Sequence, residues 1–360
     1  MRVLFVTRKF PPSIGGMEVF AEELSRELQE KCRDVTVFKP VPAILGRPGP
    51  IVLLRFFLKA SLAILSDARK MDIVLFGDGV LTPLAWVAKW GSLGKVATVV
   101  TAHGNDMYYA RQHKFSAAIY NAALKIFSRY TDLLVANSSD TQRIATSLGF
   151  RRSITIHLAT RPADEVLVPE PWPKSILFAG RLMRCKGISW FVRSVMPLID
   201  PSVTLLVAGP TWDPEELDAV KQCQRARYLG TVPRASLPKL RGECIACIMP
   251  NLPAELSGQN EGFGLSALES AAVGVPVVAS NLGGLAEAVV EGVTGFLVEP
   301  MDADGFAGRI NEIARWSPDR RLHFAQTARQ TIAERFSWGR VANDYIAEFD
   351  RFIHSGSSAS

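Results

Sequence analysis

The sequence predicts an α/β protein built from two domains, each containing a doubly wound parallel sheet. Short apolar runs of strand length alternate with segments of helical periodicity along the chain. Such alternation is typical of parallel sheets covered by helices. A proline-rich stretch, residues 161–174, separates two series of this kind and predicts an interdomain linker. With 360 residues and 48% hydrophobic content, the chain is long enough to bury a core in each domain.

The first series begins with RVLFVT, followed by the turn PPSIGG and the helical pattern MEVFAEELSRELQE. The later strand-like runs are VTVF, DIVLFGDG, ATVVTAHG and LLVANS, with helical patterns such as TPLAWVAKW between them. Segment 51–65, IVLLRFFLKASLAIL, is expected to be a packed crossover helix. Because Arg55 and Lys59 share one of its faces within apolar surroundings, a helix lying on a membrane is the alternative.

The second series predicts a second domain of the same architecture, with the runs SILFAGR, VTLLVAG, ARYLGTV, CIACIMP, VPVVAS and GFLVEP. We place the two domains at residues 1–165 and 166–337. A last helix over 338–354 is expected to pack back on the first domain, and residues 355–360 are expected to form a disordered tail.

Composition favours a cytoplasmic protein. No apolar run reaches the ~20 residues of a membrane-spanning helix, and the N-terminal apolar run is shorter than a signal peptide requires. The five cysteines show no framework spacing, which fits a reducing compartment. Cys244 and Cys247 form a CxxC pattern in a strand-like run, where residues three apart point to opposite faces, so we predict core positions rather than a redox or zinc site.

Positive charge is concentrated in the first domain. Residues 1–165 contain 22 lysines and arginines against 14 acidic residues, and the whole chain has a net charge of +6. This distribution suggests an anionic partner such as a membrane surface or an acidic acceptor, with ordinary solvated charge as the alternative. Nucleic acid is not expected, because the sequence lacks a stripe of interleaved basic and aromatic residues.

Two turns at strand ends carry groups that suit an anion. In PPSIGGME, Gly15 and Gly16 lie where a helix begins, so backbone N–H groups can approach an anion; relief of backbone strain is the alternative. In AGRLMRCKG, Arg181 and Lys186 flank a turn, and two cations there can neutralise a diphosphate. A solvated loop is the alternative for this pair.

Three further side chains suit a sugar ligand. The stretch NEGFGLSALES places Glu261 in a glycine loop and Glu269 on a helix that begins near Leu265. Carboxylates can bind vicinal hydroxyls such as those of ribose, and loop amides can hold sugar hydroxyls. In TAHGND, His103 follows the strand ATVVT at the sheet edge where ligands bind, and Asp106 is expected to cap or orient it.

The motifs GGME, GRLMRCKG and EGFGLSALE occur in this order and are followed by AAVGVPVVASNLGGLAEAVVEGVTGFLVEP. In this combination the chain resembles the retaining family 4 glycosyltransferases of the GT-B fold, also described as glycosyl transferases group 1, most strongly over residues 175–300. The resemblance implies two Rossmann-like domains facing a central cleft. The N-terminal domain would bind the acceptor and the C-terminal domain the nucleotide-sugar.

The resemblance also implies roles by matched position. Glu269 would bind the ribose hydroxyls, while Arg181 and Lys186 would neutralise the donor diphosphate, which the turn at Gly15 and Gly16 would face. The donor sugar would be held by His103, Glu261, Gly262, Phe263, Gly264 and Leu265. The catalytic residues would be His103, Glu261, Arg181 and Lys186.

The implied reaction moves a hexose with retention at the anomeric carbon, and the leaving diphosphate helps to take the acceptor's proton. No cofactor and no metal are expected. Asp302 and Asp304 spell DAD, which mimics a metal motif, but their place before GFAGRINEIARW favours a helix cap.

The donor is expected to be a UDP- or GDP-sugar, and the acceptor a lipid-linked or saccharide precursor at the inner face of a membrane. Peripheral binding to an anionic membrane surface would accompany such an acceptor. The alternatives are a small soluble acceptor and a non-catalytic nucleotide-sugar-binding protein. The loop NLPAELSGQ before Glu261 is expected to contact the donor sugar or the acceptor.

Overall fold

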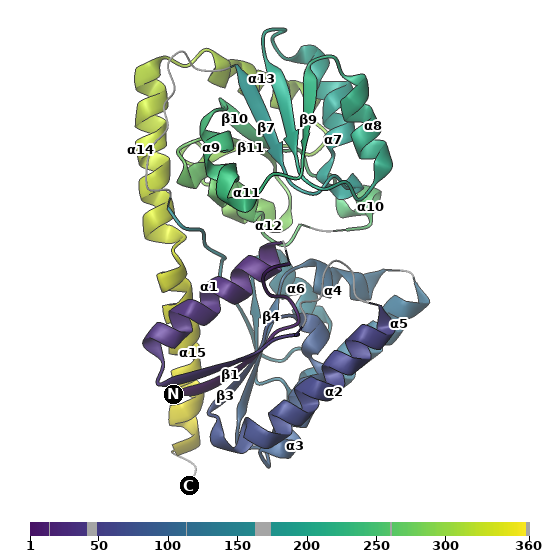
Figure 1. Ribbon diagram of the computed structural model, residues 1–360, viewed down its shortest axis with the longest axis vertical. Helices are drawn as coiled ribbons and strands as arrows, with labels where there is room; N and C mark the ends of the chain where they lie inside the picture. The colour runs from purple at the N-terminus through teal and green to yellow at the C-terminus, as the bar shows by residue number, and fades with distance from the viewer. Residues whose placement is uncertain (14, 42–48, 113, 163–173, 260, 358–360) are drawn as a thin grey trace. The chain divides into compact units, whose positions relative to one another are not determined.

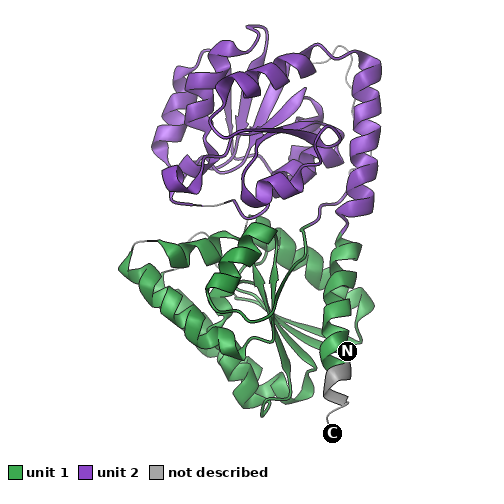
Figure 2. Cartoon of the chain, turned by 180° about the vertical axis from the view of Figure 1, so that it is seen from behind, with its two compact units in different colours: residues 1–158, 338–360 green, residues 159–337 purple. Residues whose placement is uncertain are grey.

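The computed structural model describes residues 1–360 apart from 14, 42–48, 113, 163–173, 260 and 358–360 (Figure 1). The chain divides into two compact units, coloured separately in Figure 2. Unit 1 comprises Met1–Leu158 and Trp338–Ser360, and unit 2 comprises Ala159–Ser337.

The first change of unit falls at Leu158, before the predicted boundary at residue 165. The physical reason is a backbone hydrogen bond within unit 2, in which the Thr160 amide donates to the Phe336 carbonyl at 3.0 Å. Most of the predicted linker, residues 161–174, lies outside the described residues.

Unit 1 contains a six-stranded parallel sheet in the order β2-β1-β3-β4-β5-β6. Every strand-like run predicted in this part of the chain is a strand. The sixth strand is three residues long and only half-buried, so it lacks the apolar signal of the others. The strands are β1 (Arg2–Val6), β2 (Asp34–Phe38), β3 (Ile73–Phe76), β4 (Ala97–Ala102), β5 (Leu133–Ala136) and β6 (Ser153–Thr155).

Helices cover both faces of this sheet. On one face, side chains of α2 (Pro50–Asp67) and α3 (Pro83–Gly91) form a core with those of β1, β3 and β4. On the same face, α5 (Phe115–Phe127) and α6 (Ser139–Ser147) form a core with β4 and β5, beside the single turn α4 (Asn105–Tyr108).

Segment 51–65 lies within α2 and is a packed crossover between β2 and β3, as predicted. Its residues Phe56, Ala60 and Ile64 are buried against the sheet. No helix among the described residues combines the length and the apolar character needed to cross a membrane.

The opposite face of the unit 1 sheet carries α1 (Gly16–Lys31) and α15 (Trp338–Ser357), which pack against each other. Tyr345 of α15 lies with its ring 6.3 Å from that of Phe20, and its hydroxyl is 3.0 Å from Thr101 Oγ1 of β4. The helix continues to Ser357, so residues 355–357 are helical rather than part of a tail. Once a helix has formed, each further residue adds to it at little cost.

Unit 2 contains a second six-stranded parallel sheet, in the order β12-β11-β10-β7-β8-β9. All six predicted runs are strands, so the predicted doubly wound architecture is confirmed for both halves of the chain. The strands are β7 (Ser175–Ala179), β8 (Thr204–Ala208), β9 (Ala226–Gly230), β10 (Ala246–Met249), β11 (Val277–Ser280) and β12 (Gly295–Val298).

The unit 2 helices connect these strands and extend beyond the last of them. They include a short π-helical stretch at Phe191–Val195. The α-helices are α7 (Ile188–Trp190), α8 (Pro214–Gln222), α9 (Leu237–Gly242), α10 (Ala254–Ser257), α11 (Leu265–Ala272), α12 (Gly283–Ala288), α13 (Ala303–Ala314) and α14 (Pro318–Arg335).

The predicted site residues follow the carboxyl ends of strands in both units. The strands concerned are β1 and β4 in unit 1 and β7 and β10 in unit 2. Because all neighbouring strands are parallel, their carboxyl ends share one edge of each sheet, which is where open α/β sheets bind ligands.

Candidate active site

The turn after β7 carries the two predicted cations of unit 2. The guanidinium of Arg181 lies over the ring of Trp212, 4.5 Å from its centroid. Five residues later Lys186 ends a short 3₁₀ turn, and Gly187 follows in the left-handed conformation with φ 68°. A Cβ at Gly187 would lie 2.1 Å from the Pro250 carbonyl oxygen, so glycine allows this turn to lie directly against the loop after β10.

This close approach brings Lys186 to Glu261. The Lys186 ammonium forms an ion pair with Glu261 Oε2, and the Asn251 amide donates to the same oxygen at 3.0 Å. Burial alone would raise the pKa of Glu261. The positive charge of Lys186 and the hydrogen bonds from Lys186 and Asn251 outweigh burial and hold this pKa below its usual range, so the carboxylate stays ionised.

Arg181 belongs to the same group of charges. Its charge adds to the lowering of the pKa of Glu261. Between these residues lies Cys185, whose thiol is buried; desolvation raises its pKa to about 11, while the charges of Lys186, Glu261 and Arg181 all act on it. The structure therefore brings together Arg181, Lys186 and Glu261, two cations and one carboxylate, at the carboxyl ends of β7 and β10.

Glu269 lies on α11, which begins at Leu265 as predicted. Gly264 precedes the helix with φ 91°, and a Cβ there would lie 2.6 Å from Leu285 Cδ1. The Glu269 carboxylate forms an ion pair with Arg241, which also donates to Ser266 Oγ at 3.3 Å. Each of the two glutamates therefore has its own cation.

Phe263 is 1% exposed, and its ring packs 6.4 Å from that of Phe336. Its side chain is part of the core of unit 2, so only its backbone can take part in holding a sugar. Gly262 and Gly264 beside it are also buried, and Leu265 is half-buried.

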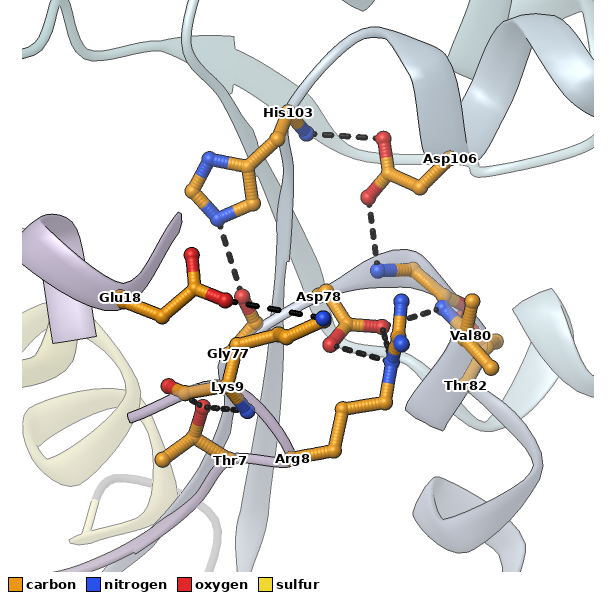
Figure 3. A network of polar contacts seen from close by, with 11 residues as sticks. Thr7, Arg8, Lys9, Glu18, Gly77, Asp78, Val80, Thr82, His103 and Asp106 are labelled. Carbon is orange, nitrogen blue, oxygen red and sulfur yellow. Dashed lines mark hydrogen bonds and ion pairs between the residues drawn. The ribbon is translucent and has the colours of Figure 1, made fainter. Parts of the chain in front are cut away.

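In unit 1 the predicted glycine turn lies beside a carboxylate. Gly16 opens α1, and Gly15 precedes it. A Cβ at Gly15 would lie 2.5 Å from Glu18 Oε2, so a larger residue there would require the Glu18 side chain to move. Lys9 Nζ lies 3.5 Å from Glu18 Oε1 (Figure 3). The turn thus combines the positive end of a helix with the negative charge of Glu18, and the positive charge of Lys9 balances that of Glu18.

His103 follows β4, and its ring is fixed on two sides. Nε2 lies 2.9 Å from the Gly77 carbonyl oxygen (Figure 3). The ring also packs edge-on against Phe20, with ring centroids 4.7 Å apart. A carbonyl oxygen only accepts hydrogen bonds, so Nε2 carries a proton. In the neutral ring Nδ1 is then unprotonated and can accept a hydrogen bond from a ligand hydroxyl.

Asp106 holds the loops on either side of His103. Its Oδ1 accepts from the His103 amide at 2.9 Å, and its Oδ2 accepts from the Gly79 amide at 2.9 Å. Asp106 thus orients the backbone of His103 rather than its ring. Burial raises the pKa of Asp106, although the nearby His103 ring and the Gly79 amide act in the opposite direction.

Beside this loop lies a buried ion pair that the sequence motifs do not indicate. Arg8 Nε is 2.9 Å from Asp78 Oδ2, and Asp78 also accepts from the Val80 amide at 2.9 Å (Figure 3). Burial would lower the pKa of Arg8, but Asp78 outweighs it and raises this pKa. Residues 8 and 78 are far apart in sequence, so no local pattern predicts their pairing.

Two groups were predicted to lie outside the site. Cys244 and Cys247 are buried, and burial raises the pKa of both thiols, as predicted for core cysteines. Asp302 caps α13 by accepting from the Gly305 amide at 2.9 Å, as predicted for the DAD sequence.

Comparisons with known proteins concern the family and the fold of the chain. The family model "Glycosyltransferase Family 4" matches residues 14–159, and the model "Glycosyl transferases group 1" matches residues 173–315. The chain is 32% identical over 180 residues to glycogen synthase of Mycobacterium tuberculosis, an alignment that covers 48% of this chain and 42% of that protein. The chain thus spans less than half the length of this relative.

Other similarities extend over nearly the whole chain. The chain is 27% identical over 401 aligned positions to alpha-maltose-1-phosphate synthase of Mycolicibacterium smegmatis, covering 96% of this chain and 98% of that protein. The crystal structure of Anabaena Alr3699/HepE in complex with UDP superposes with a TM-score of 0.72 at 18% identity, covering 98% and 100% of the two chains. With the matching models over both units and this fold, the chain belongs to the family 4 glycosyltransferases of the GT-B fold.

Proposed function

We propose that the protein is a retaining, metal-independent hexosyltransferase that uses a UDP-hexose or GDP-mannose donor and a lipid-linked or polysaccharide acceptor. The observation that carries this proposal is the grouping of Arg181, Lys186 and Glu261 at one sheet edge of unit 2. The family membership and the likeness to a UDP complex support a nucleotide-sugar as the donor.

The charges of this group suit a diphosphate. Lys186 is paired with Glu261, whereas Arg181 is exposed and held only by its stacking on Trp212 among the contacts that the structure describes. A diphosphate would accept a bidentate contact from Arg181 and share the Lys186 ammonium with Glu261. Charge that develops on the leaving diphosphate would then be stabilised by cations that are already in place.

The two glutamates would divide the rest of the donor between them. Glu269 would accept hydrogen bonds from the ribose hydroxyls, and Arg241 would hold its carboxylate in place. Glu261, fixed by Lys186 and Asn251, would accept from hydroxyls of the hexose. Asn251 opens the loop that was expected to contact the donor sugar or the acceptor, and it would serve by positioning Glu261.

Unit 1 would supply His103 and the glycine turn. His103 would accept a hydrogen bond from the transferred sugar through Nδ1, because Nε2 is engaged by Gly77. In the retaining step the bond between the anomeric carbon and the diphosphate oxygen breaks, and the acceptor oxygen bonds to that carbon on the same face. The acceptor's proton passes to the departing diphosphate, so no enzyme nucleophile is needed.

A second candidate keeps the donor chemistry but uses a small soluble acceptor. The nearly full-length similarity to a protein named alpha-maltose-1-phosphate synthase favours it. Assays with a labelled nucleotide-hexose would compare extracted membrane lipids with soluble sugars and sugar phosphates as acceptors. Transfer only to soluble acceptors would select this candidate, and absence of both transfer and donor hydrolysis would indicate a non-catalytic binding protein.

The first test is calorimetric titration of the protein with UDP and with GDP, each with and without EDTA. We expect micromolar binding of one nucleotide that EDTA does not change. Absence of binding by both, or binding that EDTA abolishes, would contradict the proposed site.

The division of labour between the glutamates is tested in the same assays. Glu269→Ala should weaken binding of the free nucleotide by about tenfold or more, because a carboxylate that binds two hydroxyls is lost. Glu261→Ala should reduce transfer far more than nucleotide binding. An equal loss of nucleotide affinity in both variants would contradict the assigned roles.

A further inference from the structure

The outer faces of α2, α3 and α5 form a large apolar surface on unit 1. The three helices cover one face of the sheet, and α3 packs against both α2 and α5. Most of the exposed large apolar side chains among the described residues lie on these helices or directly after α3. Single exposed apolar residues are ordinary, but a contiguous group of this size indicates a binding surface.

On α2 most of the exposed apolar side chains lie along one stripe, and Val52 lies beside it. Ile51, Leu54, Leu58 and Leu62 are spaced by three or four residues, and each is between 59% and 69% exposed. The opposite side of the helix is buried in the sheet core. A helix that is apolar all round normally has partners all round, whereas α2 has them only on its inner side among the described residues.

The same pattern continues on the two neighbouring helices. On α3, Trp86 and Trp90 lie one turn apart and are 46% and 66% exposed. On α5, Phe115, Ile119 and Ile126 share a face, with Phe115 84% exposed. Exposed tryptophan and phenylalanine beside leucine are typical of surfaces that enter the interfacial region of a bilayer.

The charges on this surface are almost all positive. Arg55 and Lys59 of α2 and Lys125 of α5 are exposed. Lys89 of α3 is paired with Asp132 at 2.6 Å. Asp67, at the end of α2, is the only acidic residue within the three helices. Arg55 and Lys59 flank the apolar stripe of α2, so an anionic surface could be bound by apolar and ionic contacts at the same time.

We propose that the outer face of α2, α3 and α5 docks on an anionic phospholipid membrane surface. The apolar side chains would enter the interface while Arg55, Lys59 and Lys125 contact lipid phosphates. A second copy of the chain fits less well, because a twofold contact would place this basic surface against itself. The surface does not use the donor-binding residues, so membrane docking and transferase chemistry can succeed or fail independently.

The test is co-sedimentation of the full-length protein with vesicles of phosphatidylcholine alone and of phosphatidylcholine mixed with phosphatidylglycerol. We expect binding to the mixed vesicles that weakens as salt is raised. Arg55→Glu with Lys59→Glu should weaken this binding about 30-fold or more, because two basic contacts are lost. Leu58→Ser with Leu62→Ser should also weaken it, since apolar area no longer enters the interface.

Matched variants separate these effects from general changes of charge or stability. Lys31→Glu with Arg33→Glu makes the same charge change at and just after the end of α1 and should leave vesicle binding within about twofold. Leu322→Ser removes an exposed leucine of α14, 43% exposed, and should have no effect. Circular dichroism of each variant checks that it is folded.

Three results would overturn the proposal. The first is failure of the wild-type protein to bind the mixed vesicles at low salt. The second is vesicle binding by the Arg55 and Lys59 double variant that equals that of the wild type. The third is a dimer, seen by light scattering, that does not bind vesicles and that Leu58→Ser with Leu62→Ser dissociates. The last result would assign the surface to a second copy of the chain. Nucleotide titration of the same samples reports on donor binding separately.

Discussion

The charged residues at the strand ends are held differently in the two units. In unit 1, Asp78 is fully buried and Asp106 is 8% exposed, and both accept hydrogen bonds from backbone amides. In unit 2, the side chains of Glu261 and Glu269 are 19% and 26% exposed and are held by cationic side chains. Backbone amides fix a loop, whereas a flexible lysine can share its charge with an incoming ligand. The carboxylates of unit 1 are therefore the more deeply buried and are fixed by backbone amides and, for Asp78, by Arg8, whereas those of unit 2 are partly exposed and held by side-chain cations.

The largest expected effect is on the stability of unit 1. Asp78→Ala removes the partner of the buried Arg8 guanidinium and should lower the free energy of unfolding by about 3–5 kcal/mol. Hydrogen exchange of the β3 and β4 amides as a function of urea measures this loss. Asp67→Ala is the matched control, because the Asp67 side chain is 34% exposed and its 3.8 Å ion pair is with the exposed Lys70, and it should cost no more than about 0.5 kcal/mol. A loss of unfolding free energy below about 1 kcal/mol for Asp78→Ala would show that the Arg8–Asp78 pair contributes no more than a surface ion pair does.

The next effect is on catalysis in unit 2. Lys186→Ala removes the cation that we propose to stabilise the leaving diphosphate and should lower kcat by about 10²–10³-fold. Arg184→Ala is the control, since Arg184 is an exposed cation in the same 3₁₀ turn and should leave kcat within about twofold. Steady-state transfer assays measure both variants. Similar losses in the two would point to the fold of the turn rather than to the Lys186 charge.

A smaller effect concerns pH and has opposite signs in the two units. The pKa of Glu261 is lowered in the folded protein, so its contribution to stability is present above the ordinary glutamate pKa of about 4.3 and is lost as pH falls through the folded value. The pKa of Asp106 is raised, so its contribution is full below the ordinary aspartate pKa of about 3.9 and is lost as pH rises through the folded value.

The signs of the two pH dependences are tested by urea unfolding of the wild type, Glu261→Gln and Asp106→Asn. The measurements are made at several pH values around the ordinary carboxyl pKa values of about 4. The difference in unfolding free energy between wild type and Glu261→Gln should shrink as the pH is lowered. The difference for Asp106→Asn should grow under the same change. Identical slopes for the two variants would contradict the contrast between the units.

The architecture was predictable because most of the strands are short apolar runs that are largely buried and leave a continuous signal in the sequence. The residues of the candidate site in unit 2 could be selected from local sequence, since Arg181 and Lys186 lie in one turn and Glu261 and Glu269 lie in one loop and helix. Arg241 escaped prediction because α9, LPKLRG, shows no pattern that distinguishes a buried arginine from a solvated one.

The unit 1 network was less predictable for a different reason. Its members are close in space but distant in sequence. Arg8 contacts Asp78, and Asp106 accepts a hydrogen bond from Gly79, in each case between different loops. Likewise, the sequence of α2 is that of an ordinary apolar helix and does not show that its outer face is exposed. The sequence alone therefore left open whether 51–65 would pack on protein or lie on a membrane, and the structure shows only that its inner side packs on the sheet.

The position of α15 in unit 1 has a consequence for how the protein is made. Phe20, which supports the His103 ring, packs against Trp338 and Tyr345 of this helix. The ribosome synthesises α15 only after the whole of unit 2. The part of unit 1 that holds His103 therefore stays incomplete during synthesis of unit 2, with Phe20 uncovered, and closes only when the last helix emerges. An early stop within α15, before Tyr345, would leave the rest of the chain translated but Phe20, which contacts the His103 ring, without one of its packing partners.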